Sequence, residues 1–203
     1  MSLSVSSYVR QSRRIVLRAT TLLALSLAMS GPALAQGAAP RVKLATSAGD
    51  IVLELAPEKA PKTVANFLQY VRDKHYDGTV FHRVIDGFMI QGGGYAADFK
   101  ERPTRAPVPL EARNGLRNER YTVAMARTSD PDSATAQFFI HVTDNANLDA
   151  PNPDGHGYTV FGKVVSGTEV VDRIRAVRTT SQGRMQNVPV DPITIQSATI
   201  VAK

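Results

Sequence analysis

The feature that most constrains this chain is the run FHRVIDGFMIQGGG at residues 81–94. Large apolar side chains flank an Asp-Gly pair, which is typical of the turn of a β-hairpin. One arginine, Arg83, and one glutamine, Gln91, stand among these apolar residues. Such a surface can bind an apolar ring while it directs a fixed positive charge at an uncharged amide. The run therefore predicts a hairpin that carries a binding site.

The length of the turn decides which side chains of this hairpin face one another. A two-residue turn would place Arg83 opposite Ile90, whereas a three-residue loop at 86–88 would place it opposite Gln91. A slip of one residue reverses the two faces of a strand. We predict the three-residue loop, because it pairs the two polar side chains and frees Phe88 to project into the site.

The first 35 residues are typical of an export signal and are set apart from the fold. They contain no acidic residue and four arginines, Arg10, Arg13, Arg14 and Arg18. An apolar run of 11 residues at 19–29 is too short to span a bilayer, and Ala-Leu-Ala at 33–35 matches a small-x-small cleavage pattern. We predict a secretory signal peptide at 1–35, with an amphipathic helix or a membrane anchor as the alternative.

Both export routes stay open, because SRRIVLR at 12–18 is similar to a twin-arginine signal. Residues 36–40 are expected to form a short tether before a single domain at 41–203. The whole chain carries a net charge of +6, but loss of the four arginines leaves 20 basic and 18 acidic residues. This balance predicts no nucleic-acid partner. The chain has no cysteine, which excludes disulfides and thiol chemistry.

The remaining pattern is mostly that of short strands. Alternating apolar residues at 42–46 and 51–55 predict a hairpin, and Pro61 begins a segment with the spacing of an amphipathic helix up to about Lys74. A second helix is expected at 168–175. Further strands are expected at 79–85, 89–92, 122–126, 138–142, 160–164 and 193–201. This pattern favours an antiparallel barrel, although periodicity alone does not distinguish it from a sandwich.

Three sequence blocks resemble the cyclophilin family of peptidyl-prolyl cis-trans isomerases, and its bacterial periplasmic members in particular. They are the run at 81–94, then MAR at 125–127 with AQFFI at 136–140, and then NLD at 147–149 with YTVFGKV at 158–164. The resemblance covers roughly residues 41 to 203. It implies a mainly β fold, a closed eight-stranded antiparallel barrel capped by two α-helices, with a packed interior and an active site on the outer face.

The reaction that this resemblance implies needs no nucleophile, metal or cofactor. The X–Pro amide has a rotation barrier of about 18–20 kcal/mol and isomerises spontaneously in roughly tens to hundreds of seconds. A catalyst must bind the twisted amide better than either planar form. Because the twisted prolyl nitrogen is a better hydrogen-bond acceptor, a donor aimed at it binds more strongly as the bond rotates.

The resemblance assigns each candidate residue a role. Arg83 is the expected catalytic donor, and Gln91 is expected to hold it or to bond the substrate backbone. The proline pocket would be formed by Phe88, Met89, Phe139 and Leu148. Further substrate contacts are expected from Ala126, the backbone near Arg127, Gln137 and Tyr158. His82 alternates away from Arg83 and is expected to be structural, while Phe138 is expected to point into the barrel.

Some positions depart from the common family pattern. Asn147 stands where many members have an aromatic residue, which implies weak binding of cyclosporin, the cyclic peptide inhibitor of the family. Tyr158 stands where histidine is common, and its ring and hydroxyl can still serve the pocket. Arg127 replaces a common asparagine, which suggests a hypothesis that it favours acidic residues before the proline.

Other signals are weaker. The glycines at 92–94 lack the lysine and Ser/Thr of a phosphate loop, and we expect them to permit tight backbone turns. The four histidines lack metal-ligand spacing, so no metal site is predicted. The expected partners are proline-containing peptides and unfolded exported proteins, with no stable membrane association after signal cleavage. We predict a periplasmic monomer; a peptide-binding chaperone on the same scaffold is the alternative.

Overall fold

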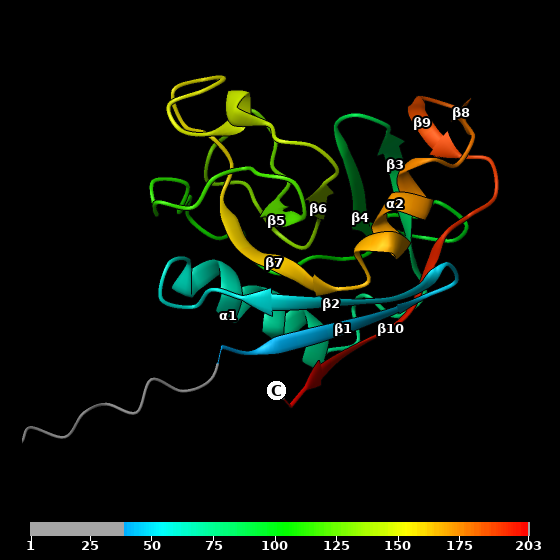
Figure 1. Cartoon of the computed structure of the whole chain (residues 1–203), viewed down its shortest axis with the longest axis horizontal. Helices are drawn as coiled ribbons and strands as arrows, with labels where there is room; N and C mark the ends of the chain where they lie inside the picture. The colour runs from blue at the N-terminus through cyan, green and yellow to red at the C-terminus, as the bar shows by residue number, and fades with distance from the viewer. Residues whose placement is uncertain (1–38, 203) are drawn as a thin grey trace, which may run out of the picture. The chain divides into compact units, whose positions relative to one another are not determined.

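Eight strands close into an antiparallel barrel in the computed structural model, which describes residues 39–202 (Figure 1). The predicted barrel is therefore confirmed. The order around the barrel is β1-β10-β3-β4-β6-β5-β7-β2. The signal peptide expected at 1–35 and most of the tether lie outside the described residues.

The barrel strands follow the alternation of apolar residues in the sequence. Their bounds are β1 Arg41–Thr46, β2 Gly49–Leu55, β3 Thr79–Ile85, β4 Met89–Ala96, β5 Thr122–Met125, β6 Phe138–His141, β7 Val160–Ser166 and β10 Thr194–Val201. Each corresponds to a predicted strand, and the main difference is that β4 continues beyond Gly92. A short 3-10 helix, η1, follows β6 at Ala146–Leu148.

Both predicted helices are present, α1 at Pro61–Arg72 and α2 at Thr168–Arg175. Proline at the first position of α1 costs no hydrogen bond, because that N–H has no partner within a helix. The buried faces of both helices, including Phe67 and Ile174, belong to the same core as the barrel interior. Neither helix, nor any other in the described chain, has the length and apolar character needed to cross a membrane.

Two apolar clusters lie on opposite sides of the barrel wall. Phe138 and Ile140 of β6 belong to the interior core, whereas Phe139, between them, belongs to a smaller cluster with Met89 and Leu148. Alternate side chains of a strand point to opposite faces, so one strand serves both clusters. The expected direction of Phe138 is confirmed, and the smaller cluster is the support for a site on the wall.

The glycine run was expected to form turns, and this prediction is wrong. Gly92, Gly93 and Gly94 lie inside β4. A methyl group at Gly93 would lie 2.8 Å from the ring of Tyr76, and one at Gly94 would lie 2.5 Å from Cγ of Gln137. Gly93 also has φ of +85°, which disfavours other residues. The run lets large side chains pack against the strand.

A second, two-stranded sheet was not predicted. It consists of β8 at Thr179–Gln182 and β9 at Met185–Pro189, joined at Gly183 and Arg184. All four residues of β8 are exposed, so the segment has no alternation of buried and exposed positions to mark it as a strand. Figure 1 shows this hairpin beside α2 and β3.

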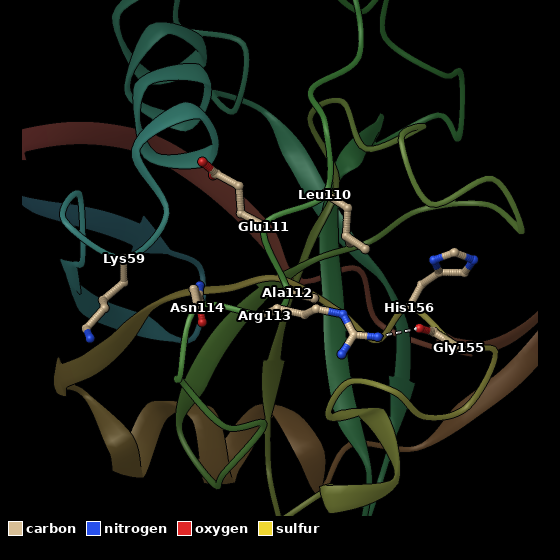
Figure 2. A pocket seen from close by; sticks show the side chains of 8 residues that line it. All are labelled: Lys59, Leu110, Glu111, Ala112, Arg113, Asn114, Gly155 and His156. Carbon is tan, nitrogen blue, oxygen red and sulfur yellow. Dashed lines mark hydrogen bonds between the residues drawn. The ribbon is translucent and has the colours of Figure 1, made fainter.

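The N-terminus of α1 is capped by a residue distant in sequence. The N-cap residue, Ala60, offers no side-chain hydrogen bond. Instead, the carboxylate of Glu111 accepts hydrogen bonds from the backbone N–H groups of Lys62, at 3.1 Å, and Thr63, at 2.9 Å. Figure 2 shows this side chain reaching toward the helix. The carboxylate also lies at the positive end of the helix dipole.

We predict that Glu111→Ala lowers the free energy of unfolding by about 1–2 kcal/mol, because it leaves these helical N–H groups without their acceptor. Urea unfolding measures the change. Glu119→Ala is the matched control, since Glu119 is an exposed acid and Glu111 is the residue that accepts the N–H groups of α1. Equal losses in the two variants would contradict the capping role.

Candidate active site

The β3–β4 hairpin pairs Arg83 with Gln91. Ile85 lies opposite Met89 and Arg83 lies opposite Gln91, so the three-residue loop at 86–88 is confirmed. Nη1 of Arg83 lies 3.3 Å from Oε1 of Gln91, which accepts its hydrogen bond. Nε2 of Gln91 in turn donates to Oε1 of Gln137 at 3.0 Å. This chain of hydrogen bonds restricts the orientation of the guanidinium group.

A pocket of about 210 Å³ lies beside this chain on the barrel wall. We call it the outer pocket. Its lining consists of Arg83, Phe88, Met89, Gln91, Ala126, Arg127, Phe139, Leu148 and Tyr158. All nine residues were predicted site residues. Of the other predicted substrate contacts, Gln137 lies beside the pocket through its hydrogen bond to Gln91.

The floor of the outer pocket is apolar and firmly packed. Met89, Phe139 and Leu148 are buried in the smaller cluster, and Phe88 and Tyr158 pack against it. The ring centroids of Phe139 and Tyr158 lie 5.7 Å apart at 74°. An edge-to-face pair of this kind holds both rings in place. The pocket therefore offers a preformed apolar surface with a guanidinium group at its edge.

The guanidinium group of Arg127 binds other residues of the same chain. The side chain is only 2% exposed and forms an ion pair with Asp154 at 2.7 Å. It also donates to the carbonyl of Gly157 and lies 4.5 Å above the ring of Tyr158. The hydrogen bond from Arg127 is the main cause that lowers the pKa of the Asp154 carboxyl. The Arg127 guanidinium group is thus already paired within the chain, which argues against the hypothesis that it attracts acidic substrate residues.

His82 and Asn147, two further residues considered in the sequence analysis, do not line the outer pocket. Asn147 is exposed on η1. His82 is buried, its ring lies 4.7 Å from that of Tyr95, and its Nδ1 has no hydrogen-bond partner in the described structure. Burial lowers the pKa of His82 from 6.5 to about 4, so the ring is neutral at pH 7. His82 was expected to alternate away from Arg83, and this prediction is wrong. Both residues line one hollow, because the pairing of β3 with β4 shifts between Phe81 and Arg83 and interrupts the alternation.

A buried polar network behind the pocket was not predicted from the sequence. Nε2 of His141 lies 2.9 Å from Oδ1 of Asn118, and its Nδ1 lies 2.7 Å from Nδ2 of Asn145. Asn145 also donates to the carbonyl of Phe88 at 2.9 Å. The His141 ring packs against that of Phe139 at 5.0 Å. The network connects β6 and the segment before η1 to the loop that carries Phe88.

Figure 2 shows a separate hollow of about 520 Å³. It is lined by Lys59, Leu110, Glu111, Ala112, Arg113, Asn114, Gly155 and His156, none of which lines the outer pocket. Arg113 donates to the carbonyl of Gly155 at 3.2 Å, and Glu111 caps α1. These polar groups hold the 154–157 loop and the helix. Within residues 39–202, no three His, Asp or Glu side chains are grouped as metal ligands would be.

Comparison with known proteins decides the family. The profile described as cyclophilin type peptidyl-prolyl cis-trans isomerase/CLD matches residues 41–200. The chain belongs to the cyclophilin family. This cyclophilin is 60% identical to peptidyl-prolyl cis-trans isomerase cyp18 of Streptomyces antibioticus over 162 residues, which cover 79% of this chain and 98% of that protein. It is 54% identical to peptidyl-prolyl cis-trans isomerase A of Dickeya dadantii, over 95% of this chain and all of that one.

Solved structures agree with these relatives. A cyclophilin type peptidyl-prolyl cis-trans isomerase of Cryptosporidium parvum superposes with a TM-score of 0.67 and 26% identity, covering 81% of this chain and 99% of that one. A structure of the same protein in the presence of the dipeptide Ala-Pro gives a TM-score of 0.66. The chain is thus a peptidyl-prolyl cis-trans isomerase, and cyclophilins bind proline-containing peptides.

We predict that the stability of this cyclophilin falls as the pH drops below 6.5, in part because of His141. Burial lowers the pKa of this ring from 6.5 to about 4. Between these values the unfolded chain binds a proton that the folded chain does not, so acid favours unfolding. His141→Gln should be less stable at pH 7, and its deficit should shrink by about 2 kcal/mol at pH 5.

Urea unfolding at both pH values measures this difference. His156→Gln is the matched control for the loss of an exposed histidine. A deficit of the same size at pH 7 and pH 5 would show that the buried ring is not the group responsible.

We predict that Gly94→Ala impairs catalysis through Gln137. The added methyl group would lie 2.5 Å from Cγ of that side chain, which must move and release Gln91. Loss of one hydrogen bond should lower kcat/KM roughly three- to tenfold. Gly115→Ala is the control for backbone strain alone: its φ of +84° disfavours alanine, but its methyl group meets no atom within 4 Å, so kcat/KM should be unchanged. Full activity of Gly94→Ala would mean that the position of Gln137 is unimportant.

Proposed function

We propose that this cyclophilin accelerates X–Pro rotation by non-covalent stabilisation of the twisted amide, with Arg83 as the donor. The observation that supports this most directly is the Arg83 guanidinium group at the edge of an apolar pocket, held by Gln91 at 3.3 Å. No carboxylate, histidine or cysteine lines the pocket. The lining therefore suits catalysis by binding and electrostatics rather than by nucleophilic or acid-base chemistry.

The proline ring would occupy the surface formed by Phe88, Met89, Phe139 and Leu148. Burial of the ring fixes one side of the amide, so that rotation moves the other side. As conjugation is lost, the prolyl nitrogen gains its lone pair and accepts a hydrogen bond from Arg83. Because the guanidinium group is already positioned, little reorganisation is needed when the acceptor develops.

The residues before the proline would lie along the backbone at Ala126 and Arg127. The Arg127 side chain is buried whereas the residue as a whole is partly exposed, so its exposed part is backbone. Backbone groups bind any sequence, which suits an enzyme that acts on many chains. Gln137 lies beside this segment and accepts from Gln91, and it retains donors for a substrate carbonyl.

The proposed cellular role is the folding of exported proteins in the periplasm. The support is the basic and apolar sequence at 1–35, with its small-x-small pattern at 33–35. Cell fractionation with N-terminal sequencing of the mature protein tests this proposal. A protein that keeps residue 1 and stays in the cytoplasm would contradict it. We further propose that the protein is a monomer. We also propose that it binds cyclosporin weakly, because the exposed Asn147 provides no aromatic wall.

We predict that Arg83→Ala lowers kcat/KM for an Ala-Pro peptide by roughly a hundred- to a thousandfold. Arg83→Lys should recover only part of this loss, since an ammonium group lacks the fixed fork. Prolyl cis-trans exchange measured by NMR with residues 36–203 gives the rates, and circular dichroism checks folding. Arg72→Ala, on the exposed face of α1, is the matched control.

The same variants, measured also for suppression of aggregation, separate the isomerase from a chaperone that only binds. A chaperone would suppress aggregation of unfolded chains equally well with and without Arg83. A folded wild-type protein that does not accelerate exchange would overturn the proposed mechanism.

A further inference from the structure

A second hollow adjoins Arg83 and has no role in the proposed reaction. It has a volume of about 260 Å³ and is lined by His82, Arg83, Arg184, Met185, Gln186 and Asn187. We call it the hairpin hollow, since four of these residues come from the β8–β9 hairpin or its turn. Arg83 lines both this hollow and the outer pocket. A peptide in the outer pocket that passes over Arg83 therefore reaches the hairpin hollow.

The barrel topology creates this hollow. Strand β10 pairs with β3 only at Thr79 and Val80, so the part of β3 that carries Arg83 has no β10 partner. Strand β9 of the β8–β9 hairpin contacts β3 where β10 does not pair with it. Figure 1 shows β9 beside β3 on the side away from β4. The hairpin thus forms a second wall next to Arg83, opposite the wall that β4 and β6 supply.

The charge of the hairpin hollow is positive. Two guanidinium groups, those of Arg83 and Arg184, line it, and no carboxylate does. Within residues 39–202, neither arginine forms a salt bridge. The amide groups of Gln186 and Asn187 add further donors. Guanidinium and amide donors around an open hollow are the chemistry that recognises a carboxylate.

We propose that the hairpin hollow is a subsite for a carboxylate that follows the proline in the bound peptide. The inference rests on the proposed function, which places the residues before the proline at Ala126, Arg127 and Gln137. None of these lines the hairpin hollow, so the chain after the proline is the part that reaches it. The carboxylate is that of an aspartate or glutamate side chain, or that of the chain end.

The expected preference is modest, because Arg184 is exposed at the tip of the hairpin. Exposed ion pairs of this kind change affinity by roughly two- to fivefold. The preference should weaken at high salt, since mobile ions screen exposed charges.

The test compares peptides that differ in one residue after the proline. C-terminally amidated Ala-Pro peptides carry Glu, Gln or Lys at the first, second or third position after the proline, and NMR exchange gives kcat/KM. The wild type should favour Glu over Gln by roughly two- to fivefold at one of these positions. Arg184→Ala should remove this ratio, and Arg184→Glu should invert it in favour of Lys. A further pair, Ala-Pro-Ala-Ala as free acid and as amide, shows whether the chain end binds in the same way.

Arg72→Glu is the control for the change in net charge, because Arg72 lies on α1 and lines neither hollow. It should keep both the Glu preference and the rate with Ala-Pro-Ala-Ala amide. The proposal is overturned if the wild type prefers neither the Glu peptides nor the free acid, or if the preference survives in Arg184→Glu. Failure of the wild type to accelerate any peptide is a different result, and it would contradict the proposed mechanism instead.

Discussion

The pairing of Arg83 with Gln91 across β3 and β4 is the constraint on which the site depends. A shift of one residue would turn Arg83 and Met89 to opposite faces and separate the charge from the apolar floor. The loop at 86–88 is therefore held from two directions. Asp86 forms an ion pair with Arg175 of α2 at 2.6 Å, and the carbonyl of Phe88 accepts from Val142 and Asn145. The helix and the buried network thus maintain the register of the hairpin.

The barrel supplies the rigidity that such a site needs. Phe138 packs edge-to-face against Phe67 and Tyr76 in the interior, while Phe139 supports the pocket from the same strand. Because protein interiors are close-packed, a displacement inside the barrel is felt at the wall. A preformed site reduces the conformational cost of binding, which would benefit the proposed mechanism, since that mechanism depends on differential binding alone.

Most strands, both helices and the register of the hairpin could be predicted from local patterns in the sequence, whereas the closed barrel and the residues of the outer pocket were predicted from the resemblance to cyclophilins. Alternation located the barrel strands, and the Asp-Gly turn with its polar pair indicated the register of Arg83 and Gln91. Contacts between distant segments could not be predicted. Glu111 caps α1, and His141 is hydrogen-bonded to Asn118. Each interaction joins segments far apart in the sequence, and no sequence pattern indicates that these segments meet. Arg127 shows the same limit, since only the fold reveals that Asp154 occupies its charge.

The β8–β9 hairpin was missed for a related reason. Its residues are polar and mostly exposed, so no buried face imposes a period of two on the sequence. Its position beside β3 depends on where the pairing of β10 with β3 ends. Thr179, Thr180 and Val188 have strand propensity and Gly183 favours a turn, which is the only sequence signal for this hairpin.

Closure of the barrel affects how an unfolded chain can bind to this protein. An open sheet presents unpaired N–H and C=O groups along its edges, and an unfolded chain can add to such an edge as a further strand. Here each of the eight barrel strands has a neighbour on both sides. A partly folded chain that bound here, as the proposed function expects, would therefore meet side chains and a short stretch of backbone rather than a template for β-aggregation. In the proposed folding role, the enzyme could release such chains readily, because the barrel sheet has no open edge to which they could pair.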